Sequence, residues 1–156
     1  MRRAVLLLLV GAGACGYGFG AGVSRLPPGA EAVRVRPLDN RSPDAEAGAL
    51  LAAALRRELA RRGAEGVAGA TAELEGEVEE SGTAPIAAGA SAWRLTLVAR
   101  VRLRTAEKTL GEARVRRSED YVAGVDALES EGRRRIALSR AADGAARELL
   151  ERLARP

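Results

Sequence analysis

The chain has 156 residues, of which 47% are hydrophobic, 29% charged and 3% aromatic, and this length allows one domain with a single modest core. It contains no histidine and only one cysteine, Cys15. This composition excludes histidine-dependent catalysis, zinc sites made of histidines or several cysteines, and internal disulfides. We therefore expect no enzyme, cofactor or metal site. The formal net charge is +4, but Arg2 and Arg3 lie in a segment that we expect to be removed. Without them, 23 of the 25 Lys and Arg residues remain against 21 acidic residues. This near-neutral balance argues against a nucleic-acid partner.

The N-terminal segment has the pattern of an export signal. Its positively charged start at residues 2–3 is followed by an apolar stretch over residues 4–11 and by the small residues 12–14, which lead directly to Cys15. An apolar stretch of about ten residues is too short to span a membrane as a helix, which needs about 20 residues. We therefore predict a signal peptide over residues 1–14.

The position of Cys15 indicates lipidation. A run of small residues that ends in the only cysteine of an exported chain resembles a bacterial lipobox, with Ala12 where leucine is usual. The resemblance implies that Cys15 becomes the first mature residue and carries acyl chains that hold the protein on a membrane. Gly16 follows it in place of aspartate, which by the usual sorting pattern implies the periplasmic face of the outer membrane. The alternative is an ordinary signal peptide with an incidental free thiol.

A tether and a first strand follow the cysteine. Glycine-rich residues 16–22 and a later Pro-Pro-Gly turn predict an acylated tether over residues 15–29, and a single folded domain over residues 30–156. Over residues 32–38 valines alternate with arginines, which is typical of a half-buried strand, and Pro37 ends this strand or places it near a sheet edge.

The next predicted element is an amphipathic helix. Ser42 is a natural N-cap and Pro43 suits the first helical position. Leucines recur at every fourth position between residues 51 and 59, and Gly63 predicts the end of the helix. Four arginines precede that glycine; they fit the negative end of the helix dipole, and an anion site is the alternative.

Three strands with one apolar and one charged face come next. Residues 70–79, 92–104 and about 109–122 alternate apolar and charged side chains. If the first two strands form a hairpin through a loop over residues 81–91, an acidic row lies beside a basic row, and each cross-strand pair contributes roughly 0.2–1 kcal/mol. The acidic row is Glu73, Glu75, Glu77 and Glu79, and the basic row beside it is Arg94, Arg100, Arg102 and Arg104. Together with Arg114 and Arg116 of the strand over residues 109–122, this basic row is our candidate contact surface for a partner.

Both rows have alternative interpretations. Paired carboxylates serve glycosidases, but these face arginines, and nothing in the sequence predicts an apolar pocket that would raise a carboxyl pKa, so we expect no catalytic residue among them. Arginines bind phosphates when their side chains converge, whereas a solvated face with matched charges needs no ligand.

A long helix ends the chain. Beyond Gly124, either Asp126 or Ser130 can cap it, and an apolar stripe runs from Leu138 to Leu153. Three consecutive arginines at 133–135 lie in its first half, where cations gain nothing from the helix dipole. They are a candidate contact for an anion or a partner, with a solvated helix face as the alternative.

The element order β-α-β-β-β-α predicts an α+β fold. A right-handed crossover after the first strand and two hairpins give a mixed four-stranded sheet, with both helices on one face, in a two-layer sandwich. The other face would be the charged one. Such a face suits water or a polar wall rather than a second core.

Five short segments carry a resemblance to a known family. The mature chain opens with C-G-Y-G-F from Cys15, and residues 33–42 contain V-R-V-R-P-L-D-N-R-S. The later strands contain A-E-L-E-G-E-V at 72–78, W-R-L-T-L at 93–97 and S-E-D-Y at 118–121. In this order, behind a lipobox, they resemble the LptE family of lipopolysaccharide-assembly lipoproteins over essentially the whole mature chain.

The resemblance implies a non-enzymatic outer-membrane lipoprotein. Members of the family plug the β-barrel of LptD, assist its assembly and help to deliver lipopolysaccharide to the outer leaflet, and they are reported to bind lipopolysaccharide through basic residues. Here residues 81–92 and 121–128 contain no basic residue, so a phosphate contact would have to use arginines of the strands or helices. A charged sheet face agrees with a plug, because barrel interiors are polar.

A second interpretation comes from a different class of envelope protein. A lipoprotein of similar small α/β fold that acts as a cofactor of cell-wall synthesis or of an export assembly would share the acyl anchor and the P-L-D-N-R-S turn. It would associate with another envelope protein. Copurification after mild detergent extraction distinguishes these two interpretations.

Overall fold

The computed structural model describes residues 26–66, 68–89 and 91–155, so the predicted signal peptide, Cys15 and most of the predicted tether lie outside the described residues. The elements are, in chain order, β1 (Val33–Val35), β2 (Asp39–Asn40), α1 (Ala47–Arg61), β3 (Ala72–Pro85), β4 (Ala92–Arg104), β5 (Thr109–Val122) and α2 (Ala127–Leu153). The predicted order of elements is confirmed, with β2 as an addition.

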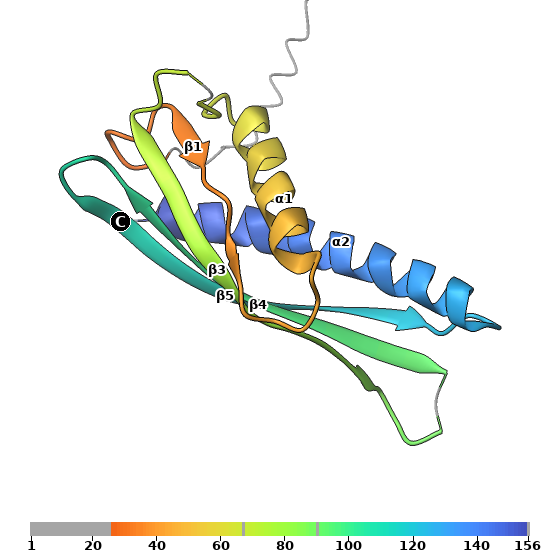
Figure 1. The fold of residues 1–156 in the computed structure, drawn as a ribbon. Coiled ribbons are helices and arrows are strands. Elements are labelled where there is room, and N and C mark those ends of the chain that lie inside the picture. The colour runs from red at the N-terminus through yellow and green to blue at the C-terminus, as the bar shows by residue number, and fades with distance from the viewer. Residues whose placement is uncertain (1–25, 67, 90, 156) are drawn as a thin grey trace, which may run out of the picture.

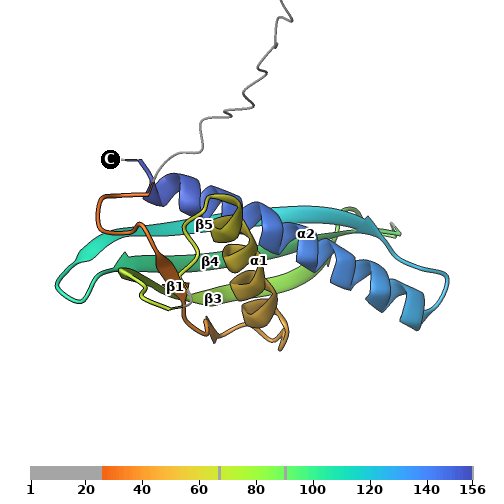
Figure 2. The ribbon, with the colours of Figure 1, turned by 90° about the horizontal axis from the view of Figure 1, so that it is seen from above.

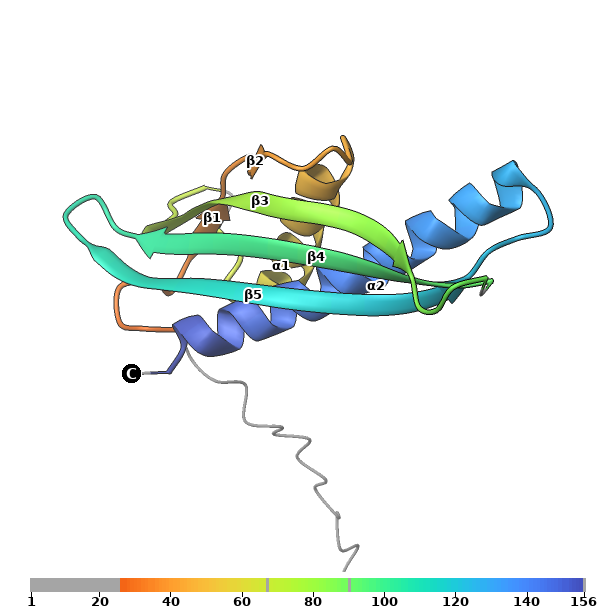
Figure 3. The same ribbon diagram turned by 90° about the horizontal axis from the view of Figure 1, so that it is seen from below.

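The strands form one mixed sheet. Its order is β1-β3-β4-β5, with β1 parallel to β3 and the two hairpin pairs antiparallel. β2, where the sequence predicts a turn, is a two-residue strand that continues the parallel pairing with β3 after Pro37. Both helices pack on one face of this sheet (Figure 1), and the strands are seen unobstructed from the other side (Figure 3). The predicted α+β two-layer architecture is therefore confirmed.

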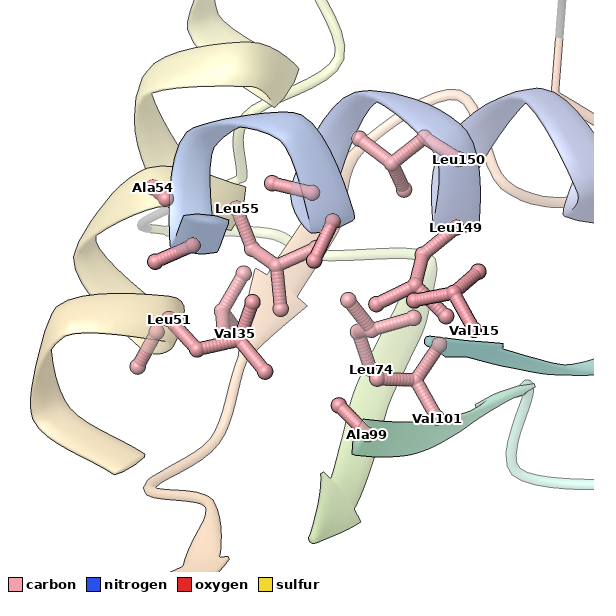
Figure 4. Close-up of a cluster of buried hydrophobic side chains, with 14 of the residues drawn as sticks. Val35, Leu51, Ala54, Leu55, Leu74, Ala99, Val101, Val115, Leu149 and Leu150 are labelled. Carbon is pink, nitrogen blue, oxygen red and sulfur yellow. The ribbon is translucent and has the colours of Figure 1, made fainter. Parts of the chain in front are cut away.

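The core lies between the sheet and the two helices. β4 alternates as predicted, and its side chains toward the helices are fully buried at Leu95, Leu97, Ala99, Val101 and Leu103. The helices contribute buried leucines that include Leu51, Leu55, Leu59, Leu138, Leu149 and Leu150. Figure 4 shows leucines of both helices directed toward the apolar side chains of β3, β4 and β5. Each buried leucine contributes about 1.5–3 kcal/mol, so this interface holds the domain together.

α1 begins later than the sequence predicts. Ser42 is not its N-cap and Pro43 is not its first residue, because the helix starts at Ala47. The Ser42 hydroxyl instead donates to Asn40 Oδ1 at 2.7 Å, and the Asn40 side-chain amide donates to the Asp44 carbonyl at 2.7 Å. These local bonds offer the backbone an alternative to the helix and hold the segment as a turn.

The other predicted helix boundaries are confirmed. α1 ends before Gly63, whose φ of +68° is the left-handed conformation that glycine adopts after a helix. Asp126 is the N-cap of α2, and its side chain accepts a hydrogen bond from the Glu129 amide at 2.8 Å. α2 has 27 residues, about 40 Å, and runs along the length of the sheet (Figure 2).

β3 is longer than predicted. It covers Ala72–Pro85 rather than residues 70–79, which shortens the predicted loop to residues 86–91. The added segment is mostly exposed and does not alternate in polarity, so its sequence resembles a loop. It is a strand because it pairs with the strongly patterned start of β4, in register from Leu97 to Trp93.

A β-bulge interrupts β3. Val78 pairs with Ala99 and Glu80 pairs with Val98, so Glu79 has no partner of its own in the ladder. A bulge places an extra residue on one strand and changes which face the following side chains meet. Glu79 and Glu80 can therefore both lie on the side away from the helices.

β5 forms one edge of the sheet, and α2 contacts its outward carbonyl groups. The Arg152 guanidinium donates to the Arg114 carbonyl at 2.7 Å. Near the other end of the strand, Arg133 donates to the carbonyls of Val122 and Ala123 at 3.3 Å each. Two long side chains of the same helix thus satisfy backbone acceptors on this edge.

Candidate functional site: the charged face of the sheet

The six arginines selected from the sequence lie on the sheet face opposite the helices. Each alternates along its strand with buried residues, and between 48% and 59% of each side chain is exposed. We call the surface that they form with the carboxylates beside them the charged face. Its residues are Arg36, Arg41, Glu73, Glu75, Glu77, Glu79, Glu80, Arg94, Arg100, Arg102, Arg104, Glu112, Arg114, Arg116 and Asp120.

The acidic row lies beside the basic row, as the hairpin hypothesis predicts. Glu73, Glu75 and Glu77 pair in register with Arg104, Arg102 and Arg100. Glu112 of β5, a carboxylate outside the predicted rows, lies on the other side of β4. Its oxygens are 3.7 Å from Arg100 and 3.5 Å from Arg102. Arg102 is also 3.9 Å from Glu75, so it bridges β3 and β5.

The remaining predicted arginines also have carboxylate partners. Arg94 binds Asp120 with two parallel hydrogen bonds, 2.8 Å from Nε and 3.0 Å from Nη2. Arg104 lies 3.7 Å from Glu75. The segment between β1 and α1 extends the pattern, since Arg41 lies 2.8 Å from Glu77. The arginines are therefore spread along strands and engaged within the face, and they do not converge on one empty centre.

The bulge gives Glu79 a central place on this face. Arg114 donates to Glu79 from Nε at 2.8 Å, and Arg100 Nε lies 3.3 Å from the other oxygen. The hydrogen bond from Arg114 lowers the pKa of Glu79, with the charges of Arg114, Arg100 and Arg41 acting in the same direction. The hydrogen bond from Arg94 likewise lowers the pKa of Asp120. Both carboxylates therefore stay ionised at neutral pH, whereas a glycosidase acid needs a raised pKa.

Val98 is an apolar side chain on the otherwise charged side of β4. It is fully buried although no helix covers it. Its cross-strand neighbours are Glu80 and Arg116, whose charged ends lie 3.0 Å apart. The aliphatic stems of this ion pair can cover the valine while the charged ends stay in solvent.

A shallow groove crosses the charged face between the β1–β2 edge and β4. It has a volume of about 560 Å³, and its lining includes Arg36, Asp39, Glu75 and Arg102. The backbone of Gly76 is part of its lining, and a Cβ added to this residue would collide with the Arg100 carbonyl oxygen of β4. Charges of both signs line it, so it suits a polar surface rather than an apolar ligand.

The arginine cluster of α2 is not a free anion site. Arg134 pairs with Glu131 and with Asp44 of the turn before α1, and these hydrogen bonds raise its pKa. Arg135 lies 2.9 Å from Glu46 in the same segment. The cluster therefore ties α2 to the start of α1, a role that the sequence could not show because the partners lie about ninety positions away.

The described part of the chain contains neither a helix long and apolar enough to cross a membrane nor a group of His, Cys, Asp or Glu residues that could hold a metal ion. Cys15, the predicted lipid-attachment site, lies outside the described residues. The charged face is thus the candidate site that the structure brings together.

Comparison with protein families places the chain in one of them. A family model described as LptE, Lipopolysaccharide-assembly, matches residues 30–153. Among curated proteins, no sequence matches the chain.

Solved structures share the fold at low sequence identity. A lipoprotein from Caulobacter crescentus, described as putative, is 22% identical with a TM-score of 0.63, over 81% of this chain and 90% of that one. PelC from Paraburkholderia phytofirmans, solved as a dodecamer, is 17% identical with a TM-score of 0.60, over 85% and 96%. Rare lipoprotein B from Shewanella oneidensis is 14% identical with a TM-score of 0.56, over 78% and 93%.

Proposed function

Because the chain belongs to the LptE lipopolysaccharide-assembly family, we propose that it is an acylated, non-enzymatic lipoprotein of the outer membrane that plugs the β-barrel of an LptD-type protein. In this role it helps the barrel to assemble and assists delivery of lipopolysaccharide to the outer leaflet. The descriptions of two fold neighbours as lipoproteins support the anchored location.

The observation that carries the proposal is the charged face. It is a long, uncovered sheet surface whose six predicted arginines each lie within 4 Å of a carboxylate. Transfer of a charged group out of bulk water costs less free energy when the group keeps an oppositely charged partner than when it is isolated. Barrel interiors are polar and hydrated, so a surface of matched charges can lie against such a wall without a second apolar core.

The pairing of the arginines with carboxylates also limits how they could bind lipopolysaccharide. A phosphate group could bind Arg94 or Arg114 only in exchange for Asp120 or Glu79, which already hold these arginines through charge-assisted hydrogen bonds. We therefore assign the six arginines first to contact with the barrel wall. In any contact with lipopolysaccharide, the phosphate groups would have to compete with the carboxylates of this face for the arginines.

Capture of the partner tests the proposed function. The full-length lipoprotein, tagged after residue 156, should copurify with the LptD-type barrel of the same cells after mild detergent extraction. The untagged chain is the control. Capture of a cell-wall synthase or an export complex, with no barrel protein, would instead support the second interpretation and contradict this one.

The anchor gives a separate prediction. Replacing Cys15 by serine removes the acylated thiol, and no helix among the described residues could hold the chain in a membrane instead. We expect Cys15→Ser to move from the detergent phase to the aqueous phase on phase partitioning, in cells that lack the barrel partner. Detergent-phase partitioning equal to wild type would contradict the lipoprotein assignment.

A further inference from the structure

One end of the domain carries exposed aliphatic side chains. Val125 in the β5–α2 turn is 94% exposed, and Leu128 in the first turn of α2 is 84% exposed. Val122 at the end of β5 and Ile86 after the end of β3 are about half exposed. We call these four residues the apolar tip. A single exposed aliphatic residue needs no explanation, but a group on two neighbouring turns marks a candidate contact surface.

The two turns of the apolar tip are joined. The Ala123 amide of the β5–α2 turn donates to the Ser91 carbonyl of the β3–β4 turn at 2.7 Å. Cross-strand pairing of Ala92 with Val122 continues directly from this bond. The two turns therefore lie side by side at one end of the sheet (Figure 3).

The β5–α2 turn is held by a capping network. The Asp126 side chain accepts from the Glu129 amide at 2.8 Å, and Glu129 Oε2 accepts in return from the Val125 amide at 2.9 Å. Arg133 pairs with Glu129 and also donates to the carbonyls that precede the turn. The backbone that presents Val125 and Leu128 is thus fixed before any partner arrives.

Gly124 completes this network. Its amide donates to Ser130 Oγ at 2.9 Å. A Cβ on this residue would lie 2.5 Å from the Cβ of Glu129 and 2.7 Å from the Ser130 amide nitrogen. Only glycine allows this approach of the turn to the first turn of α2. A surface that is fixed in advance loses little conformational freedom on binding, which favours a role in recognition.

The apolar tip lies at the opposite end of the domain from the tether. A Cβ on Gly29 would contact Thr105 at 3.6 Å, so the chain enters beside the β4–β5 turn, where α2 also ends (Figure 2). The 27 residues of α2 separate the two ends by about 40 Å. The ten residues between Cys15 and Leu26 span at most about 35 Å, so the tethered end of the domain stays near the membrane. When the long axis of the domain is perpendicular to the membrane, the apolar tip is directed away from the anchoring leaflet.

The chemistry of the tip also disfavours a lipid headgroup. Residues 81–92 and 121–128 contain no lysine or arginine, and Asp126 and Glu129 lie within or beside the second turn. Phosphate headgroups attract basic segments rather than acidic ones. An apolar pocket in a protein satisfies Val125 and Leu128 without a phosphate contact.

We propose that the apolar tip is a preformed hydrophobic anchor that inserts Val125 and Leu128 into an apolar pocket of the partner protein. This rests on the proposed function for the identity of the partner, an LptD-type barrel. The tip adds a second contact, distinct from the charged face, at the end of the domain remote from the membrane anchor.

Charge substitution at the tip tests this proposal. In the full-length tagged chain, Val125→Asp with Leu128→Asp should lower the amount of copurified barrel roughly tenfold or more, because each carboxylate would enter an apolar pocket. Both side chains are exposed, so the melting temperature should stay unchanged. Ile136→Asp is the matched control, since Ile136 is also an exposed aliphatic residue, 54% exposed, but lies on α2 outside the tip. Wild-type capture by the double variant would overturn the proposal.

A cross-linking experiment separates this inference from the proposed function. Capture of no barrel by the wild-type chain would contradict the proposed function itself. In that case, a photoreactive benzoylphenylalanine at position 125 of the full-length chain, expressed in its own cells, tests the role of the apolar tip independently of barrel capture. A cross-link to one protein identified by mass spectrometry, lost in a variant with Leu128→Asp, would support the anchor. Cross-links to phospholipid or lipopolysaccharide only would overturn it.

Discussion

Val101→Asp should reduce the stability of the domain severely. Val101 is fully buried, points toward the helices near Leu74 and Leu149 (Figure 4), and pairs across strands with Gly76 and Ala113, which offer no polar side chain. Aspartate is close to valine in size, so the substitution mainly introduces an unpaired carboxylate. The expected loss is about 4 kcal/mol, which lowers the melting temperature by roughly 10–20 °C. Thermal unfolding followed by circular dichroism measures it.

The neighbouring residue provides the control. Arg102 has a side chain that is 48% exposed on the charged face. Arg102→Asp should cost about 1 kcal/mol or less, because exposed ion pairs contribute little. Equal melting losses for the two variants would show that the apolar and charged sides of β4 are assigned to the wrong faces.

Reversal of two arginines of the charged face should separate partner binding from folding. Arg100→Glu with Arg102→Glu places two further carboxylates beside Glu75, Glu79 and Glu112. Loss of the ion pairs should weaken the domain by about 1–2 kcal/mol. At the proposed contact with the barrel wall, the reversed charges would cost several kcal/mol of binding free energy, so copurified barrel should fall about a hundredfold.

A matched double reversal on the helical layer controls for net charge. Arg56 and Arg140 are exposed on α1 and α2, and Arg56→Glu with Arg140→Glu changes the net charge by the same amount. This variant should capture the barrel at the wild-type level. Normal capture by the Arg100 and Arg102 variant with an intact fold would show that the charged face is only solvated, and the interface would then lie elsewhere on the domain.

The sequence predicts which side chains lie on each face of the sheet better than it predicts the strand pairing and the ion pairs. The range 92–104 is correct for β4, because its residues alternate in polarity except at Val98 and its apolar side is buried from Leu95 to Leu103. The end of β3 is not predictable from its own residues, since residues 82–85 are all exposed and do not alternate in polarity. They pair with the start of β4, whose residues do alternate. In that segment the partner strand determines the conformation.

The ion pair between Glu80 and Arg116 depends on the bulge. A regular β3 would place Glu79 on the same side as Glu77 and direct Glu80 toward the helices. The register shift instead brings both Glu79 and Glu80 to arginines of β4 and β5. Two consecutive glutamates at the end of an alternating run are the sequence signal for this irregularity, and its exact effect on pairing is visible only in the structure.

The arginine side chains that α2 places on the edge of β5 limit how this domain can associate with other sheets. Main-chain pairing with a further strand would need the carbonyls of Arg114 and Val122, and these already accept bonds from Arg152 and Arg133. A further strand that pairs with β5 at these two positions would have to displace the guanidinium groups of Arg152 and Arg133. At these two positions the arginines of α2 thus protect the edge of β5 against edge-to-edge pairing with a second sheet.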